Sequence, residues 1–186
     1  MRYEELENVL LVGHSYGGMV ITGAADREPE RVAGMVYLDA FLPESGQSLW
    51  DIAGPERAEH HRQAALAFDG GHSLPRPAQY PPLAPELAEK WGKLFTPQPV
   101  GTQSEKWISV RPENERAWPR RHYILCTQYK GSRFHGFAAD VRAHIASGKE
   151  GWEYSEFDAA HDVVRADPQL TAGRIAQIAR AWGIGE

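Results

Sequence analysis

The stretch VLLVGHSYGGMVIT, residues 9–22, decides how the rest of the chain is interpreted. An apolar run ends in glycine, passes through a short polar turn and continues as a second apolar run. This order predicts a buried strand over 9–13 that turns directly into a buried helix over 16–27. The turn itself, GHSYG at 13–17, fits the G-x-S-x-G pattern of a nucleophile elbow.

Ser15 is the predicted nucleophile of this turn. It would stand at the tip of a tight strand-to-helix turn, where the flanking glycines relieve backbone crowding. The backbone N–H of Tyr16, at the start of the helix, would face a developing oxyanion. In the alternative interpretation, Ser15 only caps an ordinary helix. The strand before it and the helix after it favour the nucleophile.

Composition narrows the class of protein. The chain has 186 residues, of which 42% are hydrophobic and 24% charged, as in an ordinary globular domain. The net charge of −5 argues against nucleic-acid or anionic-membrane partners. Cys126 is the single cysteine, so no internal disulfide forms, and we expect a cytoplasmic setting. No cofactor and no metal site are predicted, because the histidine spacings match no metal signature.

Alternating strands and helices predict an α/β fold. After the helix at 16–27, further strands are expected at 32–38, 122–126 and 152–157, and further helices at 133–147 and 168–182. Together these segments indicate a core of about four parallel strands with helices on both faces. The mixed polarity of 152–157 suits a sheet edge.

Residues 43–119 interrupt this alternation. Most of the prolines fall here, together with Trp50, Trp91, Trp107 and Trp118. Short helices are expected at about 55–68 and 85–95. We interpret the segment as a cap inserted between core segments 1–42 and 120–186, with Trp50 and Trp91 contacting substrate. The alternative is a packing lobe that merely covers the sheet.

A serine nucleophile needs a base, and His161 is the best-placed histidine. It follows the strand at 152–157 and precedes the last helix, at the sheet edge where active sites of α/β proteins gather. His135 is a second candidate, and a surface role is the alternative for His161. We expect His14 to line the nucleophile pocket and to contact substrate; the alternative is a packing role.

The acid that orients the base is predicted to be Asp39. No carboxylate follows the strand at 122–126 until Asp140, deep in a helix. Asp39 ends the apolar strand at 32–38, where a buried carboxylate is costly without a partner. A histidine partner would offset that penalty. In the alternative interpretation, Asp39 is an ordinary turn carboxylate.

The segments VLLVGHSYGGMVI, VYLDAFLPESGQSL, YILCTQ and FDAAHDVVRADPQ resemble an α/β-hydrolase branch. This branch contains plant methylesterases, hydroxynitrile lyases and bacterial EstC-like esterases. The resemblance implies an α/β-hydrolase core with Ser15 as nucleophile and His161 as base. Many members carry an acid after the strand equivalent to 122–126, where this chain has Gln128; some α/β-hydrolases place it after the strand equivalent to 32–38, as at Asp39.

The resemblance also implies four strands before the elbow strand, and only eight residues precede it here. We therefore expect strand 9–13 to form a sheet edge, covered by self-association into a homo-oligomer or by a rearranged cap, unless the chain is a piece of a longer protein. The predicted function is hydrolysis of small carboxylic esters through an acyl-enzyme on Ser15. Hydroxynitrile-lyase-like chemistry and a non-catalytic hydrolase fold that binds a ligand are the alternatives.

Overall fold

The computed structural model describes residues 1–75, 85–113 and 117–185. These residues form two units, Met1–Leu42 with Ser109–Glu186, here called the first unit, and Pro43–Ile108, here called the second unit. Parts of the predicted insertion, residues 76–84 and 114–116, lie outside the described residues.

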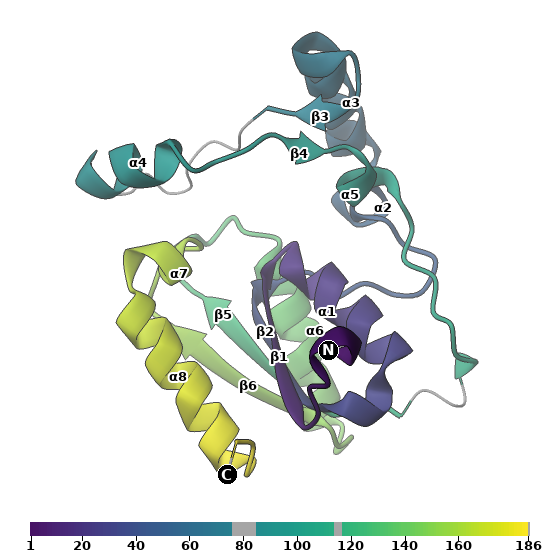
Figure 1. The fold of residues 1–186 in the computed structure, drawn as a ribbon, viewed down its shortest axis with the longest axis vertical. Coiled ribbons are helices and arrows are strands. Elements are labelled where there is room, and N and C mark those ends of the chain that lie inside the picture. The colour runs from purple at the N-terminus through teal and green to yellow at the C-terminus, as the bar shows by residue number, and fades with distance from the viewer. Residues whose placement is uncertain (76–84, 114–116, 186) are drawn as a thin grey trace. The chain divides into compact units, whose positions relative to one another are not determined.

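The first unit is built on a parallel sheet of four strands in the order β1-β2-β5-β6 (Figure 1). These are β1 (Val9–Ser15), β2 (Val32–Ala40), β5 (Arg120–Cys126) and β6 (Trp152–Phe157). The strands β2 and β5 are central, and the side chains of β2 are almost all buried. Both β1 and β6 are edge strands of this sheet, as the sequence predicts.

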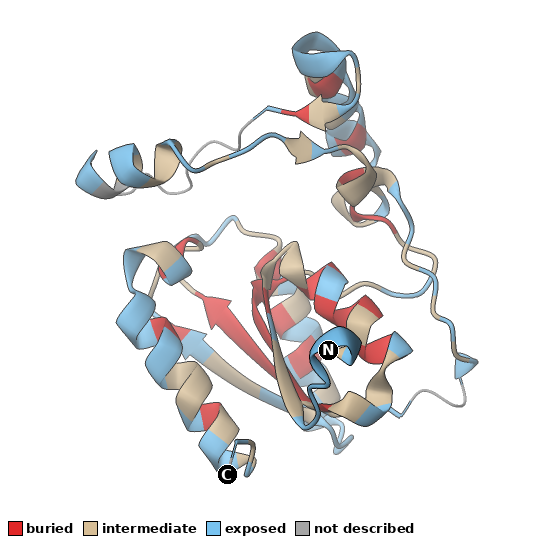
Figure 2. Cartoon of the chain, viewed as in Figure 1, coloured by how far each residue is buried: buried red, intermediate tan, exposed pale blue. Residues whose placement is uncertain are grey.

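Helices cover both faces of the sheet (Figure 1). On one face lie α1 (Gly17–Arg27) and α6 (Phe134–Ala146), and on the other lie α7 (Val163–Ala166) and α8 (Pro168–Ala181). Because side chains alternate along each strand, every central strand contributes to two separate cores. Figure 2 shows these buried positions concentrated on the central strands.

The two cores share this alternating pattern. The core under α1 and α6 includes Ile21, Met35, Tyr37, Tyr123, Leu125 and Val141. The core under α7 and α8 includes Val36, Leu38, Ile124, Phe157, Val163 and Ile178. The α/β core of four parallel strands with helices on both faces is therefore confirmed.

The start of α8 follows from local chemistry. Pro168 occupies its first turn, and the Asp167 side chain accepts a hydrogen bond from the Leu170 N–H at 2.9 Å. Two short elements, η1 (Arg2–Glu4) and η2 (Pro29–Arg31), are 3₁₀ helices. No helix among the described residues is long and apolar enough to cross a membrane.

The second unit consists of short elements. It contains α2 (Leu49–Ala53), α3 (Pro55–Asp69), β3 (Ser73–Leu74), α4 (Pro85–Gly92), β4 (Gln98–Pro99) and α5 (Gly101–Ser104). The strands β3 and β4 pair antiparallel. A capping box between Ser48 and Asp51 starts α2. The helices predicted at 55–68 and 85–95 correspond to α3 and α4.

The chain returns to the first unit at residue 109, earlier than the boundary at 119/120 expected from the sequence. The physical reason is Asp26 on α1, whose carboxylate is fully buried. It accepts hydrogen bonds from Ser109 Oγ at 2.7 Å, the Val110 N–H at 2.7 Å and Arg111 Nε at 3.2 Å. Burial alone would raise the pKa of Asp26, but these hydrogen bonds outweigh it and lower the pKa.

Candidate active site

Ser15 is the last residue of β1, and α1 begins two residues later. Its φ of 55° lies in the left-handed region, which non-glycine residues rarely occupy. A Cβ added to Gly13 would lie 2.5 Å from the Gly17 carbonyl oxygen, so this turn tolerates no side chain at Gly13. A Cβ on Gly17 would meet nothing within 4 Å. Of the two glycines in the elbow motif, Gly13 is therefore crowded by backbone atoms and Gly17 is not.

Gly18 allows a second close approach that the motif did not indicate. A Cβ added there would lie 2.1 Å from the Phe41 carbonyl oxygen. The Phe41 N–H also donates a hydrogen bond to the Ser15 carbonyl oxygen at 3.1 Å. The missing side chain at Gly18 thus lets α1 start directly against the end of β2, beside Ser15.

Asp39 lies at the carboxyl end of β2 and is 1% exposed. One carboxylate oxygen, Oδ1, accepts the Cys126 N–H at 3.1 Å, and the other, Oδ2, lies 2.6 Å from His161 Nδ1. A carboxylate only accepts hydrogen bonds, so the Nδ1–H of His161 is the donor. Both oxygens of this buried acid are therefore satisfied.

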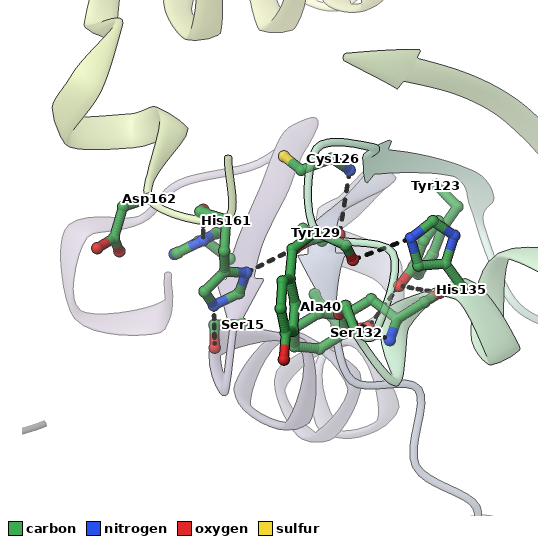
Figure 3. Close-up of polar contacts among 12 residues, drawn as sticks. Ser15, Ala40, Tyr123, Cys126, Tyr129, Ser132, His135, His161 and Asp162 are labelled. Carbon is green, nitrogen blue, oxygen red and sulfur yellow. Dashed lines mark hydrogen bonds and ion pairs between the residues drawn. The ribbon is translucent and has the colours of Figure 1, made fainter. Parts of the chain in front are cut away.

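His161 lies in the loop between β6 and α7. Its Nε2 is 3.1 Å from Ser15 Oγ, and Figure 3 shows the ring directed at Ser15. With the proton of the ring on Nδ1, Nε2 accepts the hydrogen bond of the Ser15 hydroxyl. The structure thus brings Ser15, His161 and Asp39 into one chain of hydrogen bonds, from three segments far apart in the sequence.

Gln128 holds the loop that carries His161. Its backbone N–H donates to the Ala159 carbonyl oxygen at 3.1 Å, and its side-chain Nε2 donates to the Asp158 carbonyl oxygen at 3.2 Å. Gln128 follows β5, at the position where many members of the methylesterase branch carry their acid. In this chain the position supports the histidine loop, and the carboxylate comes from β2.

Aromatic rings fix the plane of the His161 imidazole. The Phe134 ring stacks on it with centroids 4.9 Å apart and an interplanar angle of 12°. Phe41 packs edge-on against Phe134 at 5.1 Å. The sequence predicts only that Phe134 lies in the helix at 133–147, because no local signal links it to a histidine on a distant loop.

His14 lies beside the same histidine. Its Nε2 is 2.7 Å from the His161 carbonyl oxygen, and the two rings lie 4.6 Å apart. Burial, followed by the nearby charge of His161, lowers the pKa of His14 to about 4. The expected contact of His14 with substrate stays a prediction.

The remaining candidates lie elsewhere. His135 hydrogen-bonds through Nε2 to the Tyr129 carbonyl oxygen at 3.1 Å (Figure 3), so this ring nitrogen is engaged away from Ser15. Burial raises the pKa of the Cys126 thiol to about 12, which leaves it protonated at neutral pH. Among the residues described, no cluster of three or more His, Cys, Asp or Glu side chains could hold a metal ion.

Trp50 and Trp91 belong to the second unit. Trp50 lies on α2 with the Arg62 guanidinium 4.9 Å from its ring, and Trp91 lies on α4 with the Lys90 ammonium 5.3 Å from its ring. Their proposed contact with substrate stays a prediction.

Comparison with known proteins identifies the family of this chain. The model of the alpha/beta hydrolase family matches residues 3–175. The carbendazim hydrolyzing esterase of Nocardioides sp. (strain SG-4G) is 34% identical over 183 residues, which cover 94% of this chain and 73% of that protein. The chain belongs to the alpha/beta hydrolase family.

Two further proteins are similar to this alpha/beta hydrolase, one in sequence and one in fold. Salicylic acid-binding protein 2 of Nicotiana tabacum is 30% identical over 146 residues, covering 67% of this chain and 54% of that protein. An extracellular alpha/beta-hydrolase from a Paenibacillus species has a similar fold, with a TM-score of 0.74 and 21% identity. The alignment covers 95% of this chain and 74% of the Paenibacillus chain. The resemblance read from the sequence is thereby confirmed.

Proposed function

We propose that this chain is a serine esterase that cleaves small carboxylic esters through an acyl-enzyme on Ser15. The observation that carries the proposal is the hydrogen-bonded chain from Ser15 Oγ to His161 Nε2 and from His161 Nδ1 to Asp39 Oδ2. Esterase names among the relatives support the ester as the substrate class.

His161 acts first as the general base. As Ser15 Oγ attacks the ester carbonyl carbon, Nε2 takes the hydroxyl proton, and Asp39 stabilises the imidazolium that forms. The carbonyl oxygen becomes an oxyanion, to which the Tyr16 N–H at the start of α1 donates a hydrogen bond. The intermediate collapses when His161 returns the proton to the leaving alkoxide, which departs as the alcohol.

The second half of the reaction regenerates the enzyme. Water attacks the acyl group on Ser15, and His161 again takes a proton and then returns it to Ser15 Oγ. The carboxylic acid leaves, so one ester and one water give one acid and one alcohol. The left-handed φ of Ser15 and Asp39, at 55° and 42°, supports these roles, because backbone strain concentrates at functional sites.

Hydrolysis of p-nitrophenyl acetate and butyrate tests the proposal. We expect Ser15→Ala to lower kcat/KM by at least about 10³-fold, and Asp39→Asn to lower kcat by about 10³–10⁴-fold while the fold is kept. A fluorophosphonate should label wild-type Ser15, as seen by mass spectrometry. Equal rates for wild type and Ser15→Ala would reject the esterase, and a folded protein without labelling would favour a ligand-binding hydrolase fold.

Other features of the proposal concern the whole protein. The cap role of residues 43–119, the cytoplasmic location, the absence of nucleic-acid partners and self-association through 9–13 stay predictions. Sedimentation velocity of the wild-type protein and of Val12→Lys tests self-association. Val12 is chosen because it is 38% exposed on the edge strand β1, where a lysine would oppose pairing with a second strand.

A further inference from the structure

His14 connects the nucleophile strand to the backbone of the proposed base. It precedes Ser15 in β1, and its Nε2 lies 2.7 Å from the His161 carbonyl oxygen. A carbonyl oxygen only accepts hydrogen bonds, so His14 Nε2 carries the proton and donates it. One hydrogen bond therefore ties the strand that ends at Ser15 to the loop that presents His161.

The charge state of His14 suits this task. Burial and the neighbouring His161 lower the pKa of His14 to about 4, so its ring is neutral at neutral pH. A neutral ring still has one N–H to donate, and it adds no positive charge 4.6 Å from a histidine that must accept a proton. A cation in this place would make His161 a weaker base.

The other contacts of His161 do not hold its carbonyl group against the strand of Ser15. Asp39 binds Nδ1, Phe134 stacks on the ring, and Gln128 holds the backbone two and three residues earlier. The bond from His14 acts on the carbonyl group of His161 itself and comes from the strand that carries Ser15. It therefore bears directly on the distance between Ser15 Oγ and His161 Nε2, which is 3.1 Å.

We propose that His14 is a positioning residue that holds His161 at reacting distance from Ser15, and that it is not a substrate contact. This inference rests on the proposed function of Ser15 and His161. A general base misplaced by about 1 Å can lose about 10²-fold in rate, so a restraint of this kind is measurable.

The test compares two substitutions at one position. His14→Phe keeps a ring but removes the donor, and His14→Gln returns an amide N–H near the place of Nε2. With p-nitrophenyl acetate we expect His14→Phe to lower kcat by about 10–100-fold with KM changed less than about twofold, and His14→Gln to recover most of the loss.

His144→Phe is the matched control. His144 lies on the last turn of α6, away from Ser15, and its Nε2 also hydrogen-bonds a backbone carbonyl oxygen, that of Glu150.

The kinetic pattern separates the possible roles. A substrate contact would raise KM in both variants and leave kcat unchanged, which would overturn the inference. If His14 were the titrating base, the acid limb of the pH profile of kcat/KM would vanish in His14→Gln, and this would overturn it too. We expect that limb to persist in His14→Gln, because the proposed base, His161, is still present.

A second measurement does not depend on ester hydrolysis. In protein with ¹⁵N-labelled histidine, the Nδ1–H proton of His161 is identified by its loss in Asp39→Asn. We expect it to broaden and exchange faster with solvent in His14→Phe, and to be retained in His14→Gln and His144→Phe. An unchanged resonance in folded His14→Phe would refute the positioning role, even if Ser15→Ala showed that the protein is no esterase.

Should His14→Phe fail to fold, a His14→Gln protein with the kinetics and resonance of wild type supports the inference, and one without them rejects it.

Discussion

Ser15 shows at the scale of one residue how stability and function conflict. Its φ of 55° is unfavourable for a side chain with a Cβ, and the conformation is held by Gly13 packed against Gly17 and by the hydrogen bond from Phe41. The same conformation leaves Oγ at the end of β1, within reach of His161 Nε2. The strain is therefore tied to the residue that the proposed chemistry requires.

Replacing Ser15 by glycine and by alanine separates strain from chemistry. Both variants lose the hydroxyl and should be inactive, but glycine adopts a positive φ freely. We expect Ser15→Gly to have a free energy of unfolding about 1 kcal/mol higher than Ser15→Ala, measured by urea denaturation. Equal stabilities would mean that the turn is relaxed and that its conformation carries no penalty.

The junction of β1 and α1 shows at the scale of elements that the glycines of one motif differ. Gly13 packs against backbone atoms, which cannot move away, whereas Gly17 faces open space. We expect Gly13→Ala to lower the free energy of unfolding by about 1–3 kcal/mol and to abolish esterase activity. Gly17→Ala, the control in the same turn, should be neutral or stabilising by up to about 1 kcal/mol. Urea unfolding of both variants checks this, and similar losses at the two positions would contradict it.

Asp26 fastens the segment after residue 108 to α1. Its buried carboxylate accepts hydrogen bonds from Ser109, Val110 and Arg111, so removing it takes a charged acceptor away from three donors. We expect Asp26→Ala to lower the free energy of unfolding by about 3 kcal/mol. As a control, Glu89→Ala on α4 breaks an exposed ion pair with Lys93 and should change the free energy of unfolding by less than about 0.5 kcal/mol. A loss for Asp26→Ala as small as that of the control would show that the cluster contributes little.

His14 links the stability of the whole molecule to pH. Its pKa is about 4 in the folded protein, against an ordinary value of 6.5. Below about pH 6.5 the unfolded chain therefore binds a proton at His14 that the folded chain does not bind. The contribution of His14 to the free energy of unfolding is therefore fully present above about pH 6.5, and the free energy of unfolding falls by on the order of 3 kcal/mol as the pH falls to about 4. Urea denaturation between about pH 7 and pH 4.5 should show a smaller loss for His14→Gln than for wild type. His144→Gln serves as the control, and a loss in His14→Gln as large as in wild type would refute the linkage.

Local sequence patterns were enough to predict the α/β core, the turn that carries Ser15 and the place of His161 after the last strand. These conclusions rest on hydrophobic periodicity and on one turn motif, whose physical causes lie within a few neighbouring residues. The sequence also predicted that 9–13 and 152–157 lie at the edges of the sheet, as β1 and β6 do.

Packing between distant segments determines which further groups surround His161. Asp39, the acid predicted from the sequence, reaches Nδ1 because β2 lies between β1 and β5, whereas no sequence pattern shows that Gln128 supports the loop of His161. The bond from His14 and the stacking of Phe134 likewise join residues far apart along the chain. Such contacts depend on how β1, β2, β5 and α6 pack together, and no local pattern of residues encodes that packing.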